Sequence, residues 1–267
     1  MRAKKHTPLG QHFLTAAPIA VSVADGADVS SQDVVLEIGT GKGILTDILL
    51  KRGARVIAIE KDLKFFSLLT DRFHDELKEG RLTLVMEDIR SLDLETLKLH
   101  GKGYKVVANI PYYLTSMIIR KFLSDTNQPS TMSLLIQKEV AERIVANKGK
   151  ESILSLAVKV YGTPRIIRRV SRNLFSPPPA VDSAILSITD ISKKFFTRTC
   201  TEEKFFMLVR AGFSSKRKKL INNLLPLHAG VKDFFMASPI PLNARAEDLT
   251  CLEWKKLCEV WEDVSET

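Results

Sequence analysis

The chain has 267 residues, of which 45% are hydrophobic and 27% are charged, the composition of an ordinary soluble globular protein with room for one large domain and one small one. Its formal charge of +9 favours a polyanionic partner, with a solvated basic surface as the simpler alternative. Its three cysteines form no C-x-x-C pair, which excludes a disulfide framework and predicts free thiols in a reducing compartment.

The beginning of the chain holds a basic arm and a short apolar patch. The arm, residues 1–15, contains no acidic residue and on its own would be interpreted as a frayed tail. It includes the sequence Gly10-Gln11-His12-Phe13-Leu14. The apolar patch at residues 16–24 ends at Asp25 and is too short to span a bilayer, and it lacks the form of a signal peptide. We therefore expect a cytoplasmic protein without membrane contacts.

A glycine-rich turn follows the first expected strand, Val34–Ile38, and leads into a helix. The turn is Gly39-Thr40-Gly41-Lys42-Gly43. Glycines at such a turn let backbone N–H groups approach a nucleotide-like ligand without an intervening Cβ. The second strand, Arg55–Ile59, ends at Glu60, about 20 residues after Gly39, the spacing at which a carboxylate binds ribose hydroxyls in a Rossmann-type site. The pattern predicts a nucleoside-containing cofactor.

Two other kinds of chemistry are disfavoured. Lys42 does not belong to a P-loop, because the G-x-x-x-x-G-K-[ST] pattern is absent, so ATP hydrolysis is not expected. The five histidines form no cluster with ligand spacing, and we expect no metal cofactor.

A third expected strand, Leu82–Val85, is followed by Glu87-Asp88-Ile89. An aspartate at a strand end can accept a hydrogen bond from an adenine amine while the neighbouring aliphatic side chain covers the ring. A solvated loop acid is the alternative for Asp88. Its position at the end of a third successive strand favours the adenine contact.

The fourth strand ends in Asn109-Ile110-Pro111-Tyr112, where the sequence indicates a site for an aromatic amine. The lone pair of such an amine is delocalised into the ring, so hydrogen-bond acceptors for its N–H groups are needed before it can attack an electrophilic carbon. The side-chain oxygen of Asn109 and the backbone carbonyl of Ile110 are the candidate acceptors. Tyr112 offers a face on which a base can stack. The alternative is a plain strand-to-helix turn with a buried tyrosine.

The second half of the chain adds an aromatic residue and basic segments. Phe175 precedes three prolines, which form a rigid loop able to hold the ring toward a site, although a core phenylalanine is an equal alternative. Residues 183–188 are expected to close the sheet as a strand. The run Lys216-Arg217-Lys218-Lys219 lies in a window from 204 to 232 without acidic residues, which favours phosphate contacts over a solvated helix end. From about residue 190 only helices are expected, so we predict domains at 1–189 and 190–267.

Together these residues resemble the RsmA/KsgA family of ribosomal RNA adenine dimethyltransferases. The matching segments are residues 10–14, 35–41, 60, 87–89, 109–112, 175–183, 213–224 and 245–249. The resemblance implies an α/β fold, with a class I, Rossmann-like methyltransferase domain of seven strands and a small all-helical C-terminal domain. It also implies S-adenosylmethionine as the methyl donor. His12 stands where many members have asparagine and Thr40 where many have proline; neither change removes a hydrogen-bonding group or a flanking glycine that the site needs.

The resemblance also implies roles for individual residues. The donor would be contacted by Gln11, His12, Leu14, Gly39, Gly41, Glu60, Asp88, Ile89 and Asn109. The catalytic corner would be Asn109, Ile110, Pro111 and Tyr112. The substrate adenine would lie between Tyr112 and Phe175, and Lys216, Arg217, Lys218 and Lys219 would contact RNA.

The expected reaction is N6,N6-dimethylation of two adjacent adenosines in the hairpin loop near the 3′ end of small-subunit (16S) ribosomal RNA. The expected partner is this RNA within a pre-30S-type particle, with the enzyme acting as a monomer and contributing to small-subunit biogenesis.

Three alternatives are left open. A large-subunit (23S) RNA dimethyltransferase of the macrolide-resistance type shares the donor site and the Asn-x-Pro-Tyr corner; Gly10 and residues 245–249 favour the small-subunit enzyme. A non-catalytic ribosome assembly or RNA-binding factor could use the same fold, but the intact Asn109 and glycine turn argue against loss of catalysis. A nicotinamide dehydrogenase would leave Asn109, Tyr112 and Phe175 without a purpose.

Overall fold

The computed structural model describes residues 12–97, 99, 103–146 and 151–261. It divides the chain into two units, the first made of Met1–Glu142 with Gly162–Ser192 and the second of Arg143–Tyr161 with Lys193–Thr267. Residues 143–161 therefore group with the C-terminal helices, although in sequence they lie between two strands of the first unit. The division into domains at 1–189 and 190–267, expected from the sequence, stays a prediction.

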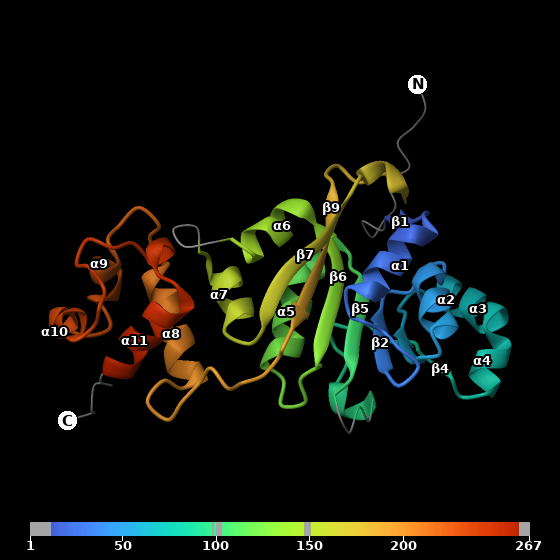
Figure 1. Cartoon of the computed structure of the whole chain (residues 1–267), viewed down its shortest axis with the longest axis horizontal. Helices are drawn as coiled ribbons and strands as arrows, with labels where there is room; N and C mark the ends of the chain where they lie inside the picture. The colour runs from blue at the N-terminus through green and yellow to red at the C-terminus, as the bar shows by residue number, and fades with distance from the viewer. Residues whose placement is uncertain (1–11, 98, 100–102, 147–150, 262–267) are drawn as a thin grey trace. The chain divides into compact units, whose positions relative to one another are not determined.

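A seven-stranded sheet forms the centre of the first unit, in the order β4-β3-β2-β5-β6-β9-β7 (Figure 1). Its strands are β2 (Val34–Ile38), β3 (Arg55–Ile59), β4 (Leu82–Val85), β5 (Lys105–Asn109), β6 (Thr131–Gln137), β7 (Thr163–Val170) and β9 (Ser183–Thr189). The first five strands in this order are parallel, whereas β9 is antiparallel to both of its neighbours. The Rossmann-like fold class expected from the sequence is confirmed.

The order of the strands reverses between β2 and β5. Strand β2 lies between β3 and β5, with Ile38 opposite both Ile59 and Ala108. Because these strands are parallel, their carboxyl ends meet at one edge, and ligands of open α/β sheets bind outside that edge at such a switch point. The fold thus brings the glycine turn after β2 next to Asn109 at the end of β5.

The edge strand β7 is an element that the sequence does not predict. Residues 183–188 form the expected strand, β9, but it does not close the sheet, because β9 lies between β6 and β7. Residues 163–170 carry three arginines and Pro164, and no strand is expected there from the sequence. Within the described residues β7 pairs with β9 alone. A free strand edge tolerates proline and leaves arginine side chains in solvent, which explains the composition.

Helices of the first unit pack on the sheet through alternate strand positions. They are α1 (Ala17–Asp25), α2 (Ile44–Lys51), α3 (Leu63–Arg72), α4 (His74–Lys78) and α5 (Thr115–Ser124), with 3-10 turns η1 (Leu94–Leu97), η2 (Tyr112–Leu114) and η3 (Arg172–Leu174); α6 (Lys138–Ile144) crosses the boundary between the units. One buried cluster joins Ala20 of α1, Leu49 of α2 and Leu69 of α3 to Val35 and Val107 of the sheet. Successive strand residues point to opposite faces, so this cluster covers one face only.

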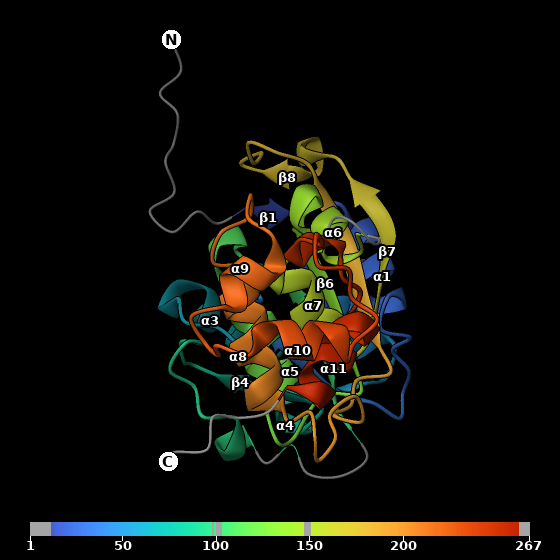
Figure 2. The same cartoon turned by 90° about the vertical axis from the view of Figure 1, so that its left-hand side faces the viewer.

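A two-stranded sheet ties the N-terminal arm to the proline-rich loop. Strand β1 (Phe13–Leu14) is antiparallel to β8 (Phe175–Ser176), with Leu14 opposite Phe175, and the two lie side by side in Figure 2. The backbone N–H of Thr15 extends this connection by donating to the Leu174 carbonyl at 3.0 Å. From His12 onward the arm is therefore part of the fold and is not a frayed tail.

The second unit consists of helices. They are α7 (Ile153–Lys159), α8 (Glu202–Gly212), α9 (Leu220–Leu224), α10 (Val231–Met236) and α11 (Cys251–Val260), with the 3-10 turn η4 (Ala246–Asp248). Thr250 and Glu253 form a capping box at the start of α11, in which the Glu253 carboxylate accepts from the Thr250 N–H at 2.8 Å. Across the described ranges of both units, no helix has the length and apolar character needed to cross a membrane.

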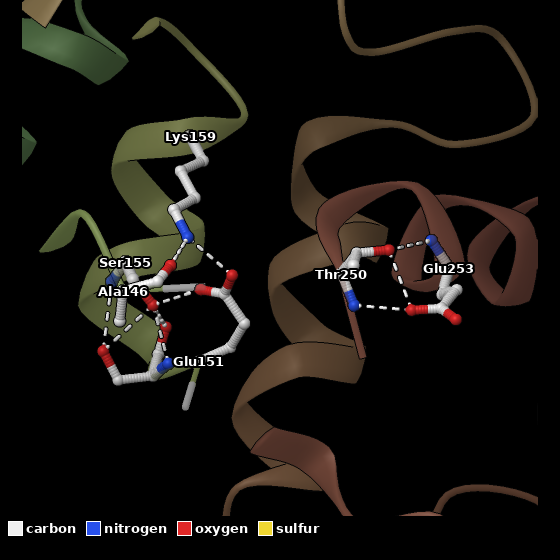
Figure 3. A network of polar contacts seen from close by, with 7 residues as sticks. Ala146, Glu151, Ser155, Lys159, Thr250 and Glu253 are labelled. Atoms are coloured by element: carbon white, nitrogen blue, oxygen red, sulfur yellow. Dashed lines mark hydrogen bonds and ion pairs between the residues drawn. The ribbon is translucent and has the colours of Figure 1, made fainter. Parts of the chain in front are cut away.

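A polar network surrounds the buried Glu151 just before α7 (Figure 3). The Glu151 carboxylate accepts hydrogen bonds from the Ser155 hydroxyl at 2.6 Å and from the Lys159 ammonium at 2.5 Å. The Glu151 N–H donates to the Glu247 carbonyl at 3.1 Å. A buried carboxylate is stable only when paired and hydrogen-bonded in this way, so the network fixes the start of α7.

Candidate active site

A cavity opens at the carboxyl ends of β2, β3 and β5, where the arm, the glycine turn and the Asn-x-Pro-Tyr corner converge. The described residues predicted to bind the donor or the substrate base all line it: His12, Leu14, Gly39, Gly41, Glu60, Asp88, Ile89, Asn109, Ile110, Pro111, Tyr112 and Phe175. Gln11, also predicted at this site, lies outside the described residues. Segments far apart in the sequence thus meet in one place.

The glycine turn leaves space that other residues would fill. Gly39 and Gly41 have φ angles of +73° and +52°, in the left-handed region that disfavours side chains. A Cβ added to Gly41 would lie 3.0 Å from Cδ1 of Phe13. The turn therefore needs glycine both for its backbone conformation and for the approach of the arm.

Glu60, at the end of β3, is held by the turn that it faces. Its Oε2 accepts hydrogen bonds from the Thr40 hydroxyl and the Gly41 N–H, both at 3.0 Å, and its Oε1 accepts from the Asp62 N–H at 2.9 Å. A carboxylate has about four acceptor positions, so capacity remains for a ligand hydroxyl. These contacts give Thr40 a definite role, which is to orient Glu60.

Asp88 forms an ion pair with its neighbour Arg90. The Arg90 Nη2 and Nε donate to the Asp88 Oδ2 at 2.6 and 3.0 Å, and the Lys61 Nζ lies 3.7 Å from the same oxygen. The Arg90 side-chain hydrogen bond is the main cause that lowers the pKa of Asp88 to about 2. Asp88 is therefore an ionised acceptor at neutral pH, and a ligand amine would share it with Arg90.

The side chain of Asn109 is oriented by the N-terminal arm. Its Nδ2 donates a hydrogen bond to the backbone carbonyl of His12 at 3.3 Å, which leaves Oδ1 as the acceptor available to a ligand. The Ile110 carbonyl oxygen has no donor within the described chain; the next residue, Pro111, has no N–H. Two acceptors are thus presented by adjacent residues of the cavity wall.

His12 links this corner to the proline-rich loop. Its Nδ1 donates to the Pro177 carbonyl at 2.8 Å, and its ring centroid lies 5.9 Å from that of Tyr112. One residue of the arm therefore contacts both the Tyr112 ring and the proline-rich loop.

The two predicted stacking residues have different environments. Tyr112 is half-buried; its hydroxyl is hydrogen-bonded to the Ser183 hydroxyl at 2.8 Å, and desolvation raises the pKa of Tyr112. Phe175 is only 4% exposed and belongs to the core cluster as well as to the cavity wall. No ring contact joins Tyr112 to Phe175 within the described ranges, so neither ring uses the other as its stacking partner.

Glu37 is a cavity residue that no sequence motif singles out for a role. It reaches the cavity wall from β2, is 1% exposed, and in the described chain both carboxyl oxygens and the nearby Thr46 hydroxyl lack hydrogen-bond partners. Desolvation is the main cause that raises the pKa of Glu37 to about 8, and the charge of Glu60 adds to this shift. Its place in the strand, one residue before Ile38, gives the sequence signal: an acid inside a buried apolar run.

The predicted RNA contacts lie on a loop of the second unit. Lys216, Arg217, Lys218 and Lys219 are all exposed between α8 and α9. The buried side chain of Asn223 braces the loop by donating to the Gly212 carbonyl at 2.5 Å and to the Ser215 carbonyl at 3.0 Å. No ion pair to these four residues is found among the residues that the structure describes. The loop therefore presents four unneutralised charges on a fixed backbone.

No group of three or more metal-ligating side chains occurs in the described ranges. The cavity contains acceptors, a glycine turn and aromatic faces, which together suit a nucleoside ligand.

Comparison with known proteins identifies the family. Residues 2–263 match the family model described as Ribosomal RNA adenine dimethylase. The chain belongs to this family. A Ribosomal RNA small subunit methyltransferase A from Dehalococcoides mccartyi is 38% identical over 96% of this chain and 88% of the relative. The protein with the same description from Fusobacterium nucleatum is 36% identical over 98% and 99% of the two chains.

Solved structures agree on the fold of this dimethylase family member. The crystal structure of a dimethyladenosine transferase from Plasmodium falciparum has a TM-score of 0.75 and 29% identity, covering 92% of this chain and 96% of that chain. The 23S rRNA methyltransferase ErmE also gives a TM-score of 0.75, at 22% identity and with coverage of 93% and 98%. The predicted family and enzyme class are confirmed, whereas the two folds are equally similar and do not separate the RNA targets.

Proposed function

We propose that this dimethylase acts on small-subunit ribosomal RNA and converts two adjacent adenosines near its 3′ end to N6,N6-dimethyladenosine, with S-adenosylmethionine as donor. The observation that carries the proposal is the convergence of Asn109, the Ile110 carbonyl and Tyr112 with the glycine turn and Glu60 in one cavity. The relatives at 36 to 38% identity, both described as small-subunit enzymes, favour that RNA over large-subunit RNA.

The cavity fits the donor. The side-chain-free turn at Gly39 and Gly41 admits a nucleoside, Glu60 has remaining acceptor capacity for ribose hydroxyls, and Asp88 is ionised and able to accept from the adenine amine. We assign His12, Leu14 and the neighbouring Gln11 of the arm to the same ligand, with Ile89 against its ring. When bound, S-adenosylmethionine supplies an electrophilic methyl carbon.

The corner activates the substrate amine by accepting from its N–H groups. The Asn109 Oδ1 and the Ile110 carbonyl withdraw the amine from conjugation and stabilise the positive charge that develops on nitrogen as the methyl group is transferred. The methylated nitrogen then loses its extra proton to solvent water. Tyr112 supports one face of the base and Phe175 bounds the other. Pro111 fixes the backbone between the two acceptors.

Glu60→Gln is expected to weaken donor binding about five- to a hundredfold, because the amide places an N–H group where the Thr40 hydroxyl and the Gly41 N–H now donate to a carboxylate. Calorimetry with S-adenosylmethionine measures the change. Glu87→Gln, an exposed acid of the same cavity, serves as control and should bind as the wild type does. Equal affinities of the wild type and the Glu60 variant would remove Glu60 from the donor site.

Charge reversal of Lys216, Arg217, Lys218 and Lys219 is expected to weaken binding of small-subunit particles. The slope of log affinity against log salt should fall by about 0.9 for each phosphate that the protein no longer neutralises. Filter binding across a salt series gives the slope. Reversal of Arg165 and Arg168 on β7 is the control for a two-residue reversal of Lys216 and Arg217 on the loop, which changes the charge by the same amount. If the loop variant keeps the wild-type slope, these four residues are a solvated surface.

The test of the proposed function is methyl incorporation into particles. We expect label from S-adenosylmethionine in small-subunit particles that lack the modification and none in large-subunit particles. We further propose that the substrate is the RNA within an assembling pre-30S particle and that the enzyme acts as a monomer. A non-catalytic assembly factor would bind these particles without incorporating label.

A further inference from the structure

Tyr113 is a second tyrosine at the mouth of the cavity, and the proposed methyl transfer does not use it. It follows Tyr112 directly in η2 and lines the same cavity, yet it is 59% exposed. Within the described residues its hydroxyl has no hydrogen-bond partner, in contrast to the Tyr112 hydroxyl, which binds Ser183. The fold therefore does not need the Tyr113 ring, and its apolar faces remain open to a ligand.

The backbone of η2 separates the directions of the two rings. Residues of a 3-10 helix follow one another at about 120° around the axis, so consecutive side chains leave it in different directions. Tyr112 is half-buried in the wall and hydrogen-bonded to β9, whereas Tyr113 remains at the exposed rim. Tyr112 thus lies in the wall of the cavity, and Tyr113 lies at its exposed rim.

We propose that Tyr113 stacks on the nucleobase next to the adenine held at Asn109 and Tyr112. This inference rests on the proposed function, because it assumes that an RNA strand binds with one of its bases in the cavity. The base drawn into the cavity loses its stacking neighbours, and the adjacent base loses a partner as well. An exposed ring one residue from Tyr112 replaces that partner, and base–aromatic stacking is tolerant of base identity.

A nucleobase fits Tyr113 better than the donor does. The groups suited to the donor's adenine and ribose, Asp88 and Glu60, follow β4 and β3, whereas Tyr113 follows β5 immediately after the corner that takes the substrate amine. Continuity of the chain therefore places the Tyr113 backbone beside the substrate corner, with its side chain also within electrostatic range of Arg90, the partner of Asp88. Lys42, which also lines the cavity and is exposed, adds a positive charge suited to a strand of phosphates.

The test is a double-mutant cycle between protein and RNA. Small-subunit particles are assembled with RNA in which the nucleotide on either side of the target adenosine, in turn, lacks its base. For the wild type we expect one of these abasic sites to raise the dissociation constant of the particle about tenfold, and Tyr113→Ala to raise it by the same factor with intact RNA. When Tyr113→Ala binds particles with the abasic RNA, the dissociation constant should be no higher than with either change alone.

Three further measurements make the result specific. Tyr113→Phe keeps the ring and should restore wild-type binding. Leu68→Ala, a 41% exposed residue of α3 that does not line the cavity, should have no effect. Donor affinity by calorimetry should be unchanged in every variant.

The inference is overturned if Tyr113→Ala remains as sensitive to the abasic sites as the wild type, or if it weakens donor binding instead. Failure of the wild type to methylate the particles at all would overturn the proposed function, which is a separate outcome.

Discussion

Replacing Asn109 by alanine is expected to lower the rate constant of methyl transfer about a hundred- to a thousandfold, the usual effect of removing one preorganised polar group that stabilises developing charge. The side chain contributes an acceptor whose direction is set by the hydrogen bond from Nδ2 to the His12 carbonyl. The substitution should therefore lower the rate of methyl transfer itself. Binding of small-subunit particles should change little, because Lys216, Arg217, Lys218 and Lys219 and the stacking rings of the corner are kept.

Single-turnover transfer of labelled methyl groups measures the rate, and filter binding measures the affinity for particles. Asn109→Asp is the informative companion. It keeps an acceptor but brings a negative charge toward the His12 carbonyl, so we expect a rate between those of the wild type and the alanine variant. Unchanged turnover in Asn109→Ala would contradict the assignment of the corner.

Glu37→Gln is expected to change the pH dependence of stability more than any other single substitution in the cavity. The folded-state pKa of Glu37, about 8, lies above the ordinary value of 4.5. Between these values the unfolded chain releases the proton while the folded chain keeps it, so the free energy of unfolding falls as pH rises through this window. Below it both states are protonated and the stabilisation is fully present.

The glutamine variant has nearly the same shape as the protonated carboxyl but cannot ionise. Near pH 5 its free energy of unfolding should be close to that of the wild type, and by pH 8 to 9 it should exceed the wild type by on the order of 3 kcal/mol. Urea unfolding at pH 5, 7 and 9 provides the comparison. Glu87→Gln should follow the wild-type curve, and a Glu37 variant that also runs parallel to the wild type would show that Glu37 is ionised in the folded protein.

Much of the site could be predicted because its residues end apolar runs. Glu60, Asp88 and Asn109 each follow or end a short strand. Parallel strands bring their carboxyl ends to one edge of the sheet whatever the side-chain packing between them. The glycine turn is equally local, since the conformations of Gly39 and Gly41 follow from their lack of a side chain.

What the sequence does not predict depends on contacts between distant segments. The pairing of β1 with β8 joins residues more than 150 positions apart in the chain, and two-residue strands leave no periodic pattern. The strand β7 is hidden because an edge position suits charged residues and proline. Residues 143–161 group with the C-terminal helices through contacts such as that of the Glu151 N–H with the Glu247 carbonyl, which join distant positions and leave no local pattern.

The roles of Thr40 and Glu37 escape prediction for a related reason. The role of Thr40 is visible only from the 3.0 Å hydrogen bond between its hydroxyl and Glu60. The role of Glu37 is visible only from the burial of its carboxyl group without hydrogen-bond partners in the described chain. Both belong to the motif that the sequence identifies, but their function is set by the neighbouring strand.

Primer extension on both ribosomal RNAs, after incubation with the enzyme and S-adenosylmethionine, decides which RNA and which bases the enzyme modifies. Dimethylation blocks the pairing edge of adenine and so stops the extending strand. We predict a stop at two adjacent adenosines near the 3′ end of small-subunit RNA and full-length extension of large-subunit RNA. A stop in large-subunit RNA alone would contradict the proposed function.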